Sequence, residues 1–140
     1  MPLTDVWYRL VAFVLTAVFL LLPARPEAVA LTVTQQEDAL LVEYVNNTHR
    51  GIEVGGNHFM LEKEADRNWE AIPFREGFGF PAIAATVVPT DTGRFTVRPD
   101  RCFDDPLSPG RYRLTFYYSC PSNALYVGGE QAATVEFDLT

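Results

Sequence analysis

The 140-residue sequence has few of the residues that most often carry catalysis. It contains two cysteines and two histidines, which is too few for a disulfide-dense miniprotein or a four-cysteine zinc site. A serine hydrolase is also disfavoured, because no Gly-x-Ser-x-Gly elbow is present. Basic residues are scarce as well, since 11 Lys and Arg stand against 18 Asp and Glu, a formal net charge of −7. Nucleic acids are bound by basic faces, so this balance excludes them from the expected partners.

A hydrophobic run long enough to span a membrane comfortably is missing, although the N-terminus is apolar. The uncharged run that ends at Ala24 has 15 residues, and a helix of that length reaches about 22 Å, short of the ~30 Å hydrocarbon core. Ala28-Val29-Ala30 follows it, a small-x-small pattern that signal peptidase accepts. We therefore expect residues 1–30 to be a signal peptide whose helix is cleaved off near Ala30, the alternative being an uncleaved membrane anchor.

Export sets the expected compartment and the extent of the mature domain. The mature chain, residues 31–140, would be extracytoplasmic, either periplasmic or secreted. It would touch a membrane only through the N-terminal segment, and only if that segment stays uncleaved. At 110 residues it has the length of one domain.

The mature chain alternates apolar and polar side chains, which is the two-residue period of half-buried strands. No window shows the three-to-four-residue spacing of an amphipathic helix. About seven short strands separated by turn-forming clusters predict an all-β fold, an antiparallel β-sandwich in which Trp69 is the largest core residue. The other inward-facing candidates are Leu31, Leu40, Val42, Tyr44, Ile72, Phe95, Val97, Tyr112, Leu114, Phe116, Tyr118, Val135, Phe137 and Leu139.

The second half carries a recognisable pattern at Leu107-Ser-Pro-Gly-Arg-Tyr-Arg-Leu114. A Pro-Gly turn followed by Tyr-x-Leu opens the penultimate strand of many immunoglobulin-like sandwiches, where the tyrosine hydroxyl hydrogen-bonds back to the preceding loop. The wider run resembles the bacterial immunoglobulin-like (Big) domains of exported proteins, over roughly residues 31–140. Its other matching pieces are Tyr44-Val-Asn-Asn-Thr48, Phe59-Met-Leu-Glu-Lys63, Trp69-Glu-Ala-Ile-Pro73, Val88-Pro89 and Ala133-Thr-Val-Glu-Phe-Asp-Leu139.

This resemblance implies an immunoglobulin-like β-sandwich that serves as an accessory or binding module, with no shared catalytic residues to carry over. One departure concerns Trp69, which precedes both cysteines. The Cys…Trp…Cys order of antibody domains is therefore missing, and the antibody-type disulfide between the sheets is not implied.

Cys102 and Cys120 are the two cysteines. An oxidising compartment favours a disulfide, and closing a loop of about 19 residues would contribute roughly 3 kcal/mol. However, if residues 94–98 and 111–119 form neighbouring strands of opposite direction, the cysteines start at opposite ends of the sheet. The bond then forms only if residues 102–109 double back, so the sequence leaves both outcomes open. A nucleophilic cysteine is disfavoured, because no histidine stands nearby to lower the pKa of the thiol.

The histidines and a group of aspartates are the remaining candidates for metal binding. His49 and His58 flank a turn-rich connection and could hold a metal together with Glu53. Their spacing is unspecific, and exposed hairpin histidines are commoner, so we expect no metal and no other cofactor. A second cluster lacks the ordered spacing of a calcium loop and predicts a solvated surface, namely Asp100, Asp104 and Asp105.

The Asn46-Asn47-Thr48 turn has two interpretations. Asparagine side chains hydrogen-bond to nearby backbone and so end the strand before them. The same triplet is a glycosylation sequon, which matters only in a secretory pathway that glycosylates. The bacterial resemblance favours the structural interpretation.

Residues 74–82 are the segment most typical of a binding loop. They hold three phenylalanines and two glycines in nine residues, so the segment is apolar and mobile at once. The alternative is that Phe78 and Phe80 fold inward and cap the open end of the core. Two tyrosines could extend a recognition surface, unless Tyr117 simply pairs across strands. The candidate binding residues are Phe74, Phe78, Phe80, Tyr117 and Tyr126.

The expected function is that of an exported, non-enzymatic binding or accessory module of the bacterial envelope. It would act on an unidentified protein or envelope component through loop contacts or through strand addition at a sheet edge. The alternative is a structural assembly subunit, favoured if residues 31–34 form an unpaired edge. A metal- or cysteine-dependent enzyme is a third interpretation. It needs a pocket that joins His49, His58 or the cysteines, which the expected strands place on separate loops.

Overall fold

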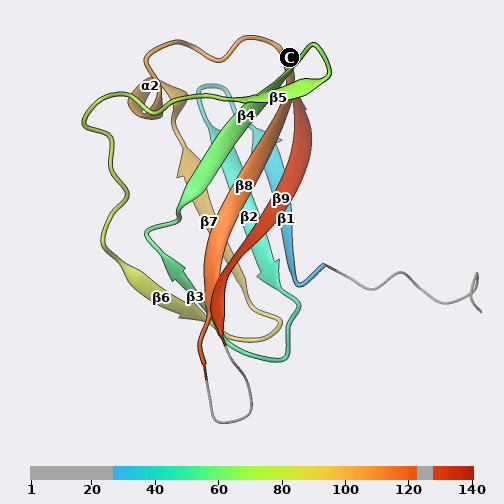
Figure 1. The fold of residues 1–140 in the computed structure, drawn as a ribbon, viewed down its shortest axis with the longest axis vertical. Coiled ribbons are helices and arrows are strands. Elements are labelled where there is room, and N and C mark those ends of the chain that lie inside the picture. Colours follow the sequence, from blue (N-terminus) through green and yellow to red (C-terminus); the bar gives the residue numbers. More distant parts are fainter. Residues whose placement is uncertain (1–26, 123–127) are drawn as a thin grey trace, which may run out of the picture.

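Alternating side chains produce nine strands and one short helix in the computed structural model, which describes residues 27–122 and 128–140 (Figure 1). The strands are β1 (Val29–Gln35), β2 (Leu40–Asn46), β3 (Ile52–Gly55), β4 (Phe59–Ala65), β5 (Asn68–Ala71), β6 (Ala84–Val87), β7 (Thr92–Val97), β8 (Gly110–Cys120) and β9 (Gly129–Leu139), and the helix is α2 (Pro99–Cys102). The expected signal helix and Tyr126 lie outside the described residues.

The strands form two antiparallel sheets that face each other across the core. The smaller sheet has the order β1-β2-β7, and the larger has the order β5-β4-β8-β3-β6 with β9 paired to β8. This arrangement confirms the all-β, immunoglobulin-like sandwich predicted from the sequence. No helix among the described residues is long and apolar enough to cross a membrane.

Two strands were not anticipated by the sequence pattern. Ile52 and Val54 are buried and alternate with the exposed Glu53 and Gly55, within the connection that the sequence predicts to be turn-rich. β6 pairs with β3 through the Val87–Ile52 register, although most of its own side chains are exposed. Such a short, exposed strand carries almost no hydrophobic period, so its pairing is decided by the neighbouring strand rather than by its own sequence.

The inner face of β8 forms the centre of the core. Tyr112, Leu114, Phe116 and Tyr118 are buried, whereas Arg113 and the other alternate residues face outward, as predicted. Phe116 stacks on Tyr44 of the opposite sheet, with ring centroids 4.7 Å apart. Each large side chain buried in this way contributes about 1.5–3 kcal/mol to folding. The two sheets are therefore held together mainly by aromatic and aliphatic contacts around β8.

The loop that enters β8 has the predicted tyrosine corner. The Tyr112 hydroxyl donates a 2.6 Å hydrogen bond to the carbonyl oxygen of Ser108, four residues upstream. The Lys63 ammonium donates to the Ser108 hydroxyl and lies over the Tyr112 ring, 5.7 Å from its centroid. A side chain at Gly110 would displace the end of the Lys63 side chain, since a Cβ there would come 2.9 Å from the lysine Cε atom. Glycine at this position therefore leaves room for the lysine.

Trp69 is not a core residue, and the prediction that it fills the core is wrong. It lies on β5 opposite Glu64, on the outer face of the larger sheet. The Arg113 guanidinium stacks over the indole, 4.7 Å from the ring centroid. The turn between β4 and β5 decides which face Trp69 takes, and a shift of one residue in register would reverse it. Phe103, which the pattern did not single out, is buried in the core instead.

Cys102 and Cys120 are both free, so of the two outcomes that the sequence leaves open the structure shows the one without a disulfide. Cys102 is the last residue of α2, and Cys120 is the last residue of β8. An 11-residue strand is roughly 36 Å long, which places the two cysteines toward opposite ends of the sandwich. The chain between α2 and β8 stays at the end where β8 begins and does not double back along the sheet (Figure 1).

The folded domain begins earlier than residue 31. Val29 opens β1, pairs with Asn46 and is only 2% exposed. The backbone N–H of Asn47 donates to the carbonyl of Ala28, 2.9 Å away, and its side-chain amide donates to the carbonyl of Glu27 at 3.0 Å. Cleavage after Ala30 would therefore remove one core side chain and two residues of a paired strand.

Candidate functional site

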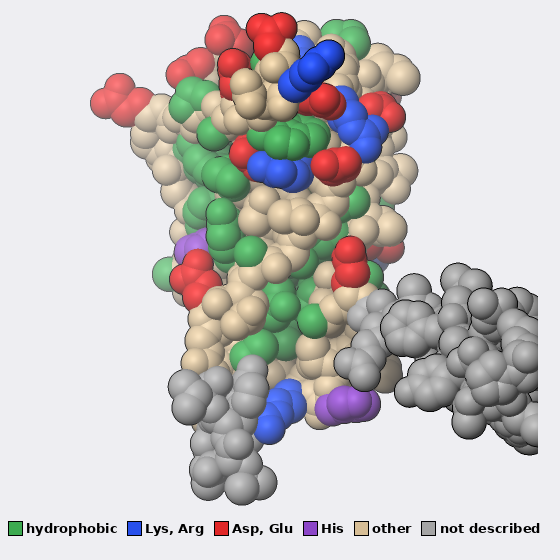
Figure 2. Space-filling model, turned by 45° about the vertical axis from the view of Figure 1, so that its right-hand side comes forward, with side chains coloured by type: hydrophobic (Ala, Val, Ile, Leu, Met, Phe, Trp, Pro, Cys, Tyr) green, Lys and Arg blue, Asp and Glu red, His purple; other side chains and the backbone are tan. Residues whose placement is uncertain are grey.

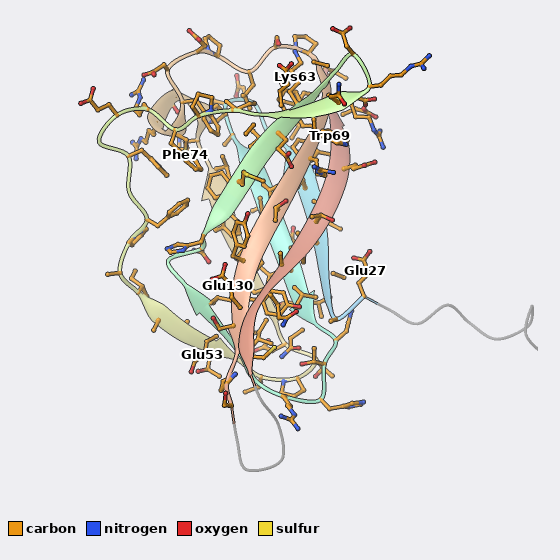
Figure 3. The ribbon with its side chains drawn as sticks, in the orientation of Figure 1. Glu27, Glu53, Lys63, Trp69, Phe74 and Glu130 are labelled. Atoms are coloured by element: carbon orange, nitrogen blue, oxygen red, sulfur yellow. The ribbon has the colours of Figure 1, made fainter. Side chains whose placement is uncertain are left out.

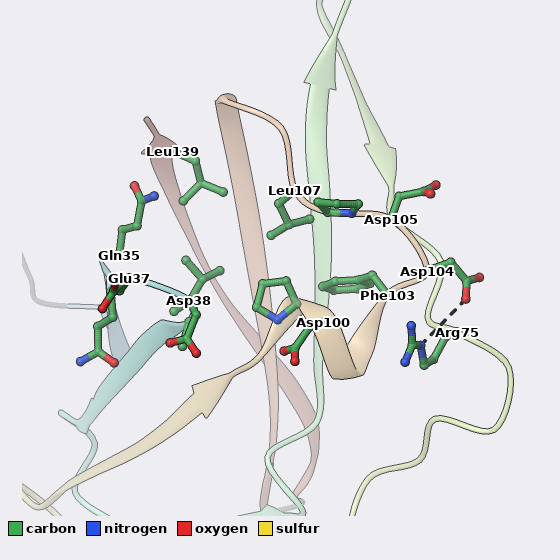
Figure 4. Close-up of a pocket in the computed structure, with 15 residues that line it drawn as sticks. Gln35, Glu37, Asp38, Arg75, Asp100, Phe103, Asp104, Asp105, Leu107 and Leu139 are labelled. Carbon is green, nitrogen blue, oxygen red and sulfur yellow. Dashed lines mark ion pairs between the residues drawn. The ribbon is translucent and has the colours of Figure 1, made fainter.

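A hollow of about 480 Å³ lies at the end of the sandwich where β8 begins and β9 ends (Figure 4). It is lined by residues 35–40 from the β1–β2 turn, by residues of α2 and the following loop, and by Arg75 and Leu139. Binding pockets for small ligands and side chains commonly measure about 300–1,000 Å³. The hollow is therefore large enough for one or two side chains of a partner.

The floor of the hollow is apolar. Phe103, Leu107 and Leu139 are buried or half-buried and line its centre. Phe103 stacks on Phe74 with ring centroids 5.5 Å apart, and Phe74 stacks in turn on Phe78 at 4.7 Å. Both pairs are nearly parallel, with interplanar angles of 14°. Phe74 and Phe78, from residues 74–82, thus pack behind the floor of the hollow. Their stacking fixes the position of the Phe103 ring.

The rim of the hollow is acidic. Two of its carboxylates face arginines: the Arg98 guanidinium lies 3.5 Å from Asp38, and Arg75 lies 3.9 Å from Asp104. Such exposed ion pairs are weak, about 0–1 kcal/mol, so both partners can rearrange. All five carboxylates are exposed, which agrees with the predicted solvated aspartate loop: Glu37, Asp38, Asp100, Asp104 and Asp105.

Phe78 and Phe80 fold against the core, as the alternative interpretation of the loop stated. Both are half-buried and pack on the core cluster. Phe80 meets Phe59 edge-on at 5.5 Å and lies against the His58 ring at 4.6 Å. These contacts within the domain already occupy the faces of both rings. A direct contact between the rings and a partner stays a prediction.

A second hollow of about 430 Å³ opens where β3 separates from β8. β3 pairs with β8 at a single position, Glu53 opposite Ser119, before β4 resumes the ladder. This hollow is lined by Tyr117 and Phe80, and the Phe80 ring meets the Phe74 ring at 5.5 Å. Figure 3 labels Phe74 above Glu53 and Glu130, which belong to this lining. Of the predicted binding residues, the structure therefore brings the three phenylalanines into one cluster of touching rings and places Tyr117 beside Phe80 at this hollow.

The histidines do not form a metal centre. His58 and Glu53 line the second hollow, together with Glu130, but His49 does not. Within residues 27–122 and 128–140, no group of three or more His, Cys, Asp or Glu side chains could hold a metal ion. The ligand set considered from the sequence, with both histidines and Glu53, is not assembled.

Cys102 is poorly placed to act as a nucleophile. Its side chain is buried, and burial raises the pKa of the thiol; the nearby Asp100 charge raises it further, while a backbone hydrogen bond from Arg98 lowers it. A raised pKa keeps the sulfur protonated, whereas catalysis needs the thiolate. The structure thus supports a packing role for Cys102 in the core.

Charged side chains on the outer face of the larger sheet neutralise one another. Arg113 holds Glu62 through two hydrogen bonds of 2.9 and 3.1 Å, and Arg111 donates to Glu136 at 2.8 Å. The hydrogen bonds that both arginines donate to these carboxylates raise the pKa values of the guanidinium groups, so the arginines remain charged. Figure 2 shows acidic and basic side chains mixed at the upper end of this face. The arrangement is a cross-strand ladder that stabilises the sheet.

The sequon at Asn46 is structural. Asn46 is fully buried, and its side-chain amide donates to the carbonyls of Arg50 at 2.7 Å and Val87 at 2.9 Å. Its side-chain oxygen accepts hydrogen bonds from the backbone N–H and the hydroxyl of Thr48. A glycan could not be attached without breaking this network and exposing the side chain. The turn-forming interpretation of the triplet is confirmed.

Comparison with models of protein families gives a match. The model of a family described as a bacterial Ig-like domain matches residues 27–127, which is most of the chain. No curated protein matches the chain. The matched range begins two residues before β1, in agreement with the early start of the folded domain.

Proposed function

Because the chain belongs to the bacterial Ig-like domain family, we propose that it is an exported, non-enzymatic binding module of the bacterial envelope. The observation that carries this proposal is the hollow above Phe103, whose apolar floor is enclosed by an acidic rim. Loops at one end of an immunoglobulin-like sandwich are free to vary while the sheets hold them in place. The loop end is therefore where such a module contacts its partner.

The chemistry of the hollow favours a partner with a cationic and an apolar group side by side. The Phe103 floor buries the apolar part, and the exposed rim carboxylates attract the charge. Arginine and lysine side chains have this form themselves, with an aliphatic stem and a charged head. The net charge of −7 extends the attraction beyond the hollow and steers basic segments toward the domain. The proposed partner is a protein segment with Arg or Lys next to a large aliphatic residue.

A titration followed by NMR of the isotope-labelled protein tests this function. The probe is the capped dipeptide acetyl-Leu-Arg-amide, with acetyl-Leu-Glu-amide as its charge-reversed control. We expect saturable shifts of the Phe103 and Leu107 amides with the arginine peptide alone. The apparent Kd should lie in the millimolar range that so few contacts allow, and added salt should weaken binding.

Two substitutions separate a specific site from general charge attraction. Asp100→Asn removes one rim carboxylate and should lower the affinity for the arginine peptide several-fold. Glu43→Gln removes an exposed carboxylate of β2 and should leave this affinity unchanged. Equal responses to the arginine and glutamate peptides would overturn the proposed function. An equal loss of affinity from the two substitutions would show that the net charge of the domain attracts the peptide without a specific site.

A further inference from the structure

β6 ends the larger sheet and has one edge free of any described strand. Its strand neighbour is β3, and the sheet order stops at β6 among residues 27–122 and 128–140. In an antiparallel strand, alternate residues point their N–H and C=O groups to opposite sides. The carbonyl of Ile83 accepts a 2.7 Å hydrogen bond from Gly56, which continues the β3 side of the ladder. The backbone groups of Ala84 and Thr86 therefore point to the open edge.

This edge lacks the charges that normally protect an exposed strand. Residues 77–90 contain no Asp, Glu, Lys or Arg. The other end strand of the larger sheet, β5, carries Glu70, and the end strand β7 of the smaller sheet carries Arg94. Charged residues on edge strands are a common device against pairing with another chain. Their absence from β6 and its flanks leaves its backbone open to pairing.

Exposed apolar side chains lie at both ends of the same strand. Ile83 is 62% exposed and Val88 is 55% exposed, and these are the exposed large hydrophobic residues of the described chain. Pro81 and Pro89 stand just outside them and lack the N–H group that a ladder needs. The edge considered for pairing is thus residues 83–88, about 20 Å long. At its end, the Val88 carbonyl already accepts a 3.1 Å hydrogen bond from the Asp91 N–H and would accept a second one from the added strand.

We propose that β6 pairs antiparallel with β6 of a second copy of this chain, which makes one continuous sheet across a dimer. A twofold axis at Thr86 sets Thr86 opposite its own counterpart and Ala84 opposite Val88 of the second copy. The same register brings Ile83 to Pro89 of the second copy. Threonine pairs across strands are favourable, and no charge meets a like charge at this interface. An isologous twofold contact of this kind closes on itself and produces a dimer rather than a fibre.

The charge of the whole chain fixes how this dimer responds to salt. Each copy carries a formal charge of −7, so the two copies repel each other while the contact itself is uncharged. Salt screens that repulsion and should strengthen the dimer. In contrast, salt should weaken binding of the arginine peptide to the hollow above Phe103. A six-residue edge is also smaller than a standard interface, so association belongs in the micromolar-to-millimolar range. The two proposals thus fail or succeed independently.

Sedimentation equilibrium of the protein tests the proposal, from about 10 µM to about 1 mM and at low salt and about 0.5 M salt. We expect the weight-average mass to rise with concentration toward twice the monomer mass, and to rise further at high salt. Thr86→Lys puts two like charges at the twofold axis and should keep the protein monomeric. Thr134→Lys is the control, because Thr134 is an exposed threonine on β9, away from this edge.

Thermal unfolding of both lysine variants shows whether each remains folded, and Ala84→Lys replaces Thr86→Lys if the latter does not. A protein that stays monomeric up to the highest concentration at both salts would overturn the proposal. A dimer that survives a folded Thr86→Lys variant would overturn it as well, since a different surface would then hold the two copies together.

Discussion

The side-chain amide of Asn46 donates a 2.9 Å hydrogen bond to the carbonyl of Val87 and so joins the two sheets. Asn46 is the last residue of β2, in the smaller sheet, and Val87 is the last residue of β6, in the larger one. The same amide also bonds to the carbonyl of Arg50 at 2.7 Å. One buried asparagine thus satisfies two backbone carbonyls and positions the lower end of the β6 edge.

Replacing Asn46 should destabilise the domain. Asn46→Ala leaves the carbonyl of Val87 buried without this donor, and we expect a loss of about 2–4 kcal/mol because all four hydrogen bonds of the side chain are removed at once. Asn47→Ala is the matched control, since Asn47 is exposed and bonds to Glu27 at the surface. Urea unfolding of both variants measures the difference. A loss equal to that of Asn47→Ala would mean that the buried network carries no stability.

The tyrosine corner should contribute a smaller amount. Tyr112→Phe keeps the buried ring but removes the 2.6 Å hydrogen bond to the carbonyl of Ser108, so we expect a loss of about 1–2 kcal/mol. Tyr117→Phe removes a hydroxyl of the same kind from the outer face of β8 and should cost less than about 0.5 kcal/mol. Denaturant unfolding of the two variants checks the ranking, and equal losses would contradict it.

The sandwich could be predicted from the sequence because its long strands have a strict two-residue period. The alternation of β8 identified its four core residues, and the Pro-Gly-x-Tyr motif identified the corner at Tyr112. Both are local signals, since they depend on residues at most a few positions apart.

The features of the fold that the sequence did not reveal depend on contacts between residues far apart in the chain. Trp69 lies on the outer face because of the turn length between β4 and β5, which its hydrophobicity does not reveal. The cysteines are separated because the α2–β8 loop stays at one end, a matter of tertiary path. The loop-end hollow joins residues 35–40 to Leu139, about 100 positions apart, so no sequence window could contain it. The sequence places Phe74 and Phe78 in one phenylalanine-rich loop, but the stacking of Phe78 on Phe74 and of Phe74 on Phe103 could be seen only in the fold.

Phe80 should behave as a structural residue in the folded domain. Phe80→Ser removes ring contacts with Phe59 and His58, and we expect a loss of about 2–4 kcal/mol. Ile83→Ser is the control, because that side chain is largely exposed and should cost less than about 1 kcal/mol. Thermal and urea unfolding measure both losses. A Phe80→Ser variant as stable as the parent would restore the ring as a candidate for direct partner contact.

The two thiols should react with alkylating reagents at different rates. Cys120 is half-exposed and should be labelled first, whereas Cys102 is buried with a raised pKa and should react only when the domain opens. Burial that raises the folded-state pKa of Cys102 contributes stability below the ordinary thiol pKa, and that contribution is lost as the pH rises through the folded-state pKa. Mass spectrometry after timed labelling checks the order, and Cys120→Ser confirms the assignment. Equal rates for the two thiols in the folded protein would show that Cys102 is accessible.

The position of the N-terminus should decide how stable the domain is. A chain that begins at Glu27 keeps Val29 in the core and the hydrogen bonds from Asn47, whereas a chain that begins at Leu31 loses both. Removing two strand residues, one of them the buried Val29, should cost about 2–4 kcal/mol. Urea unfolding of the two chains measures this difference. Val29→Thr in the longer chain separates the contribution of the side chain from that of the backbone pairing.

The intact mass of the protein recovered from an exporting host then shows which N-terminus the mature protein has. We expect a mature N-terminus at or before Glu27. A mass that begins at Leu31, on a chain as stable as the longer one, would mean that β1 needs neither Val29 nor the contacts that precede it.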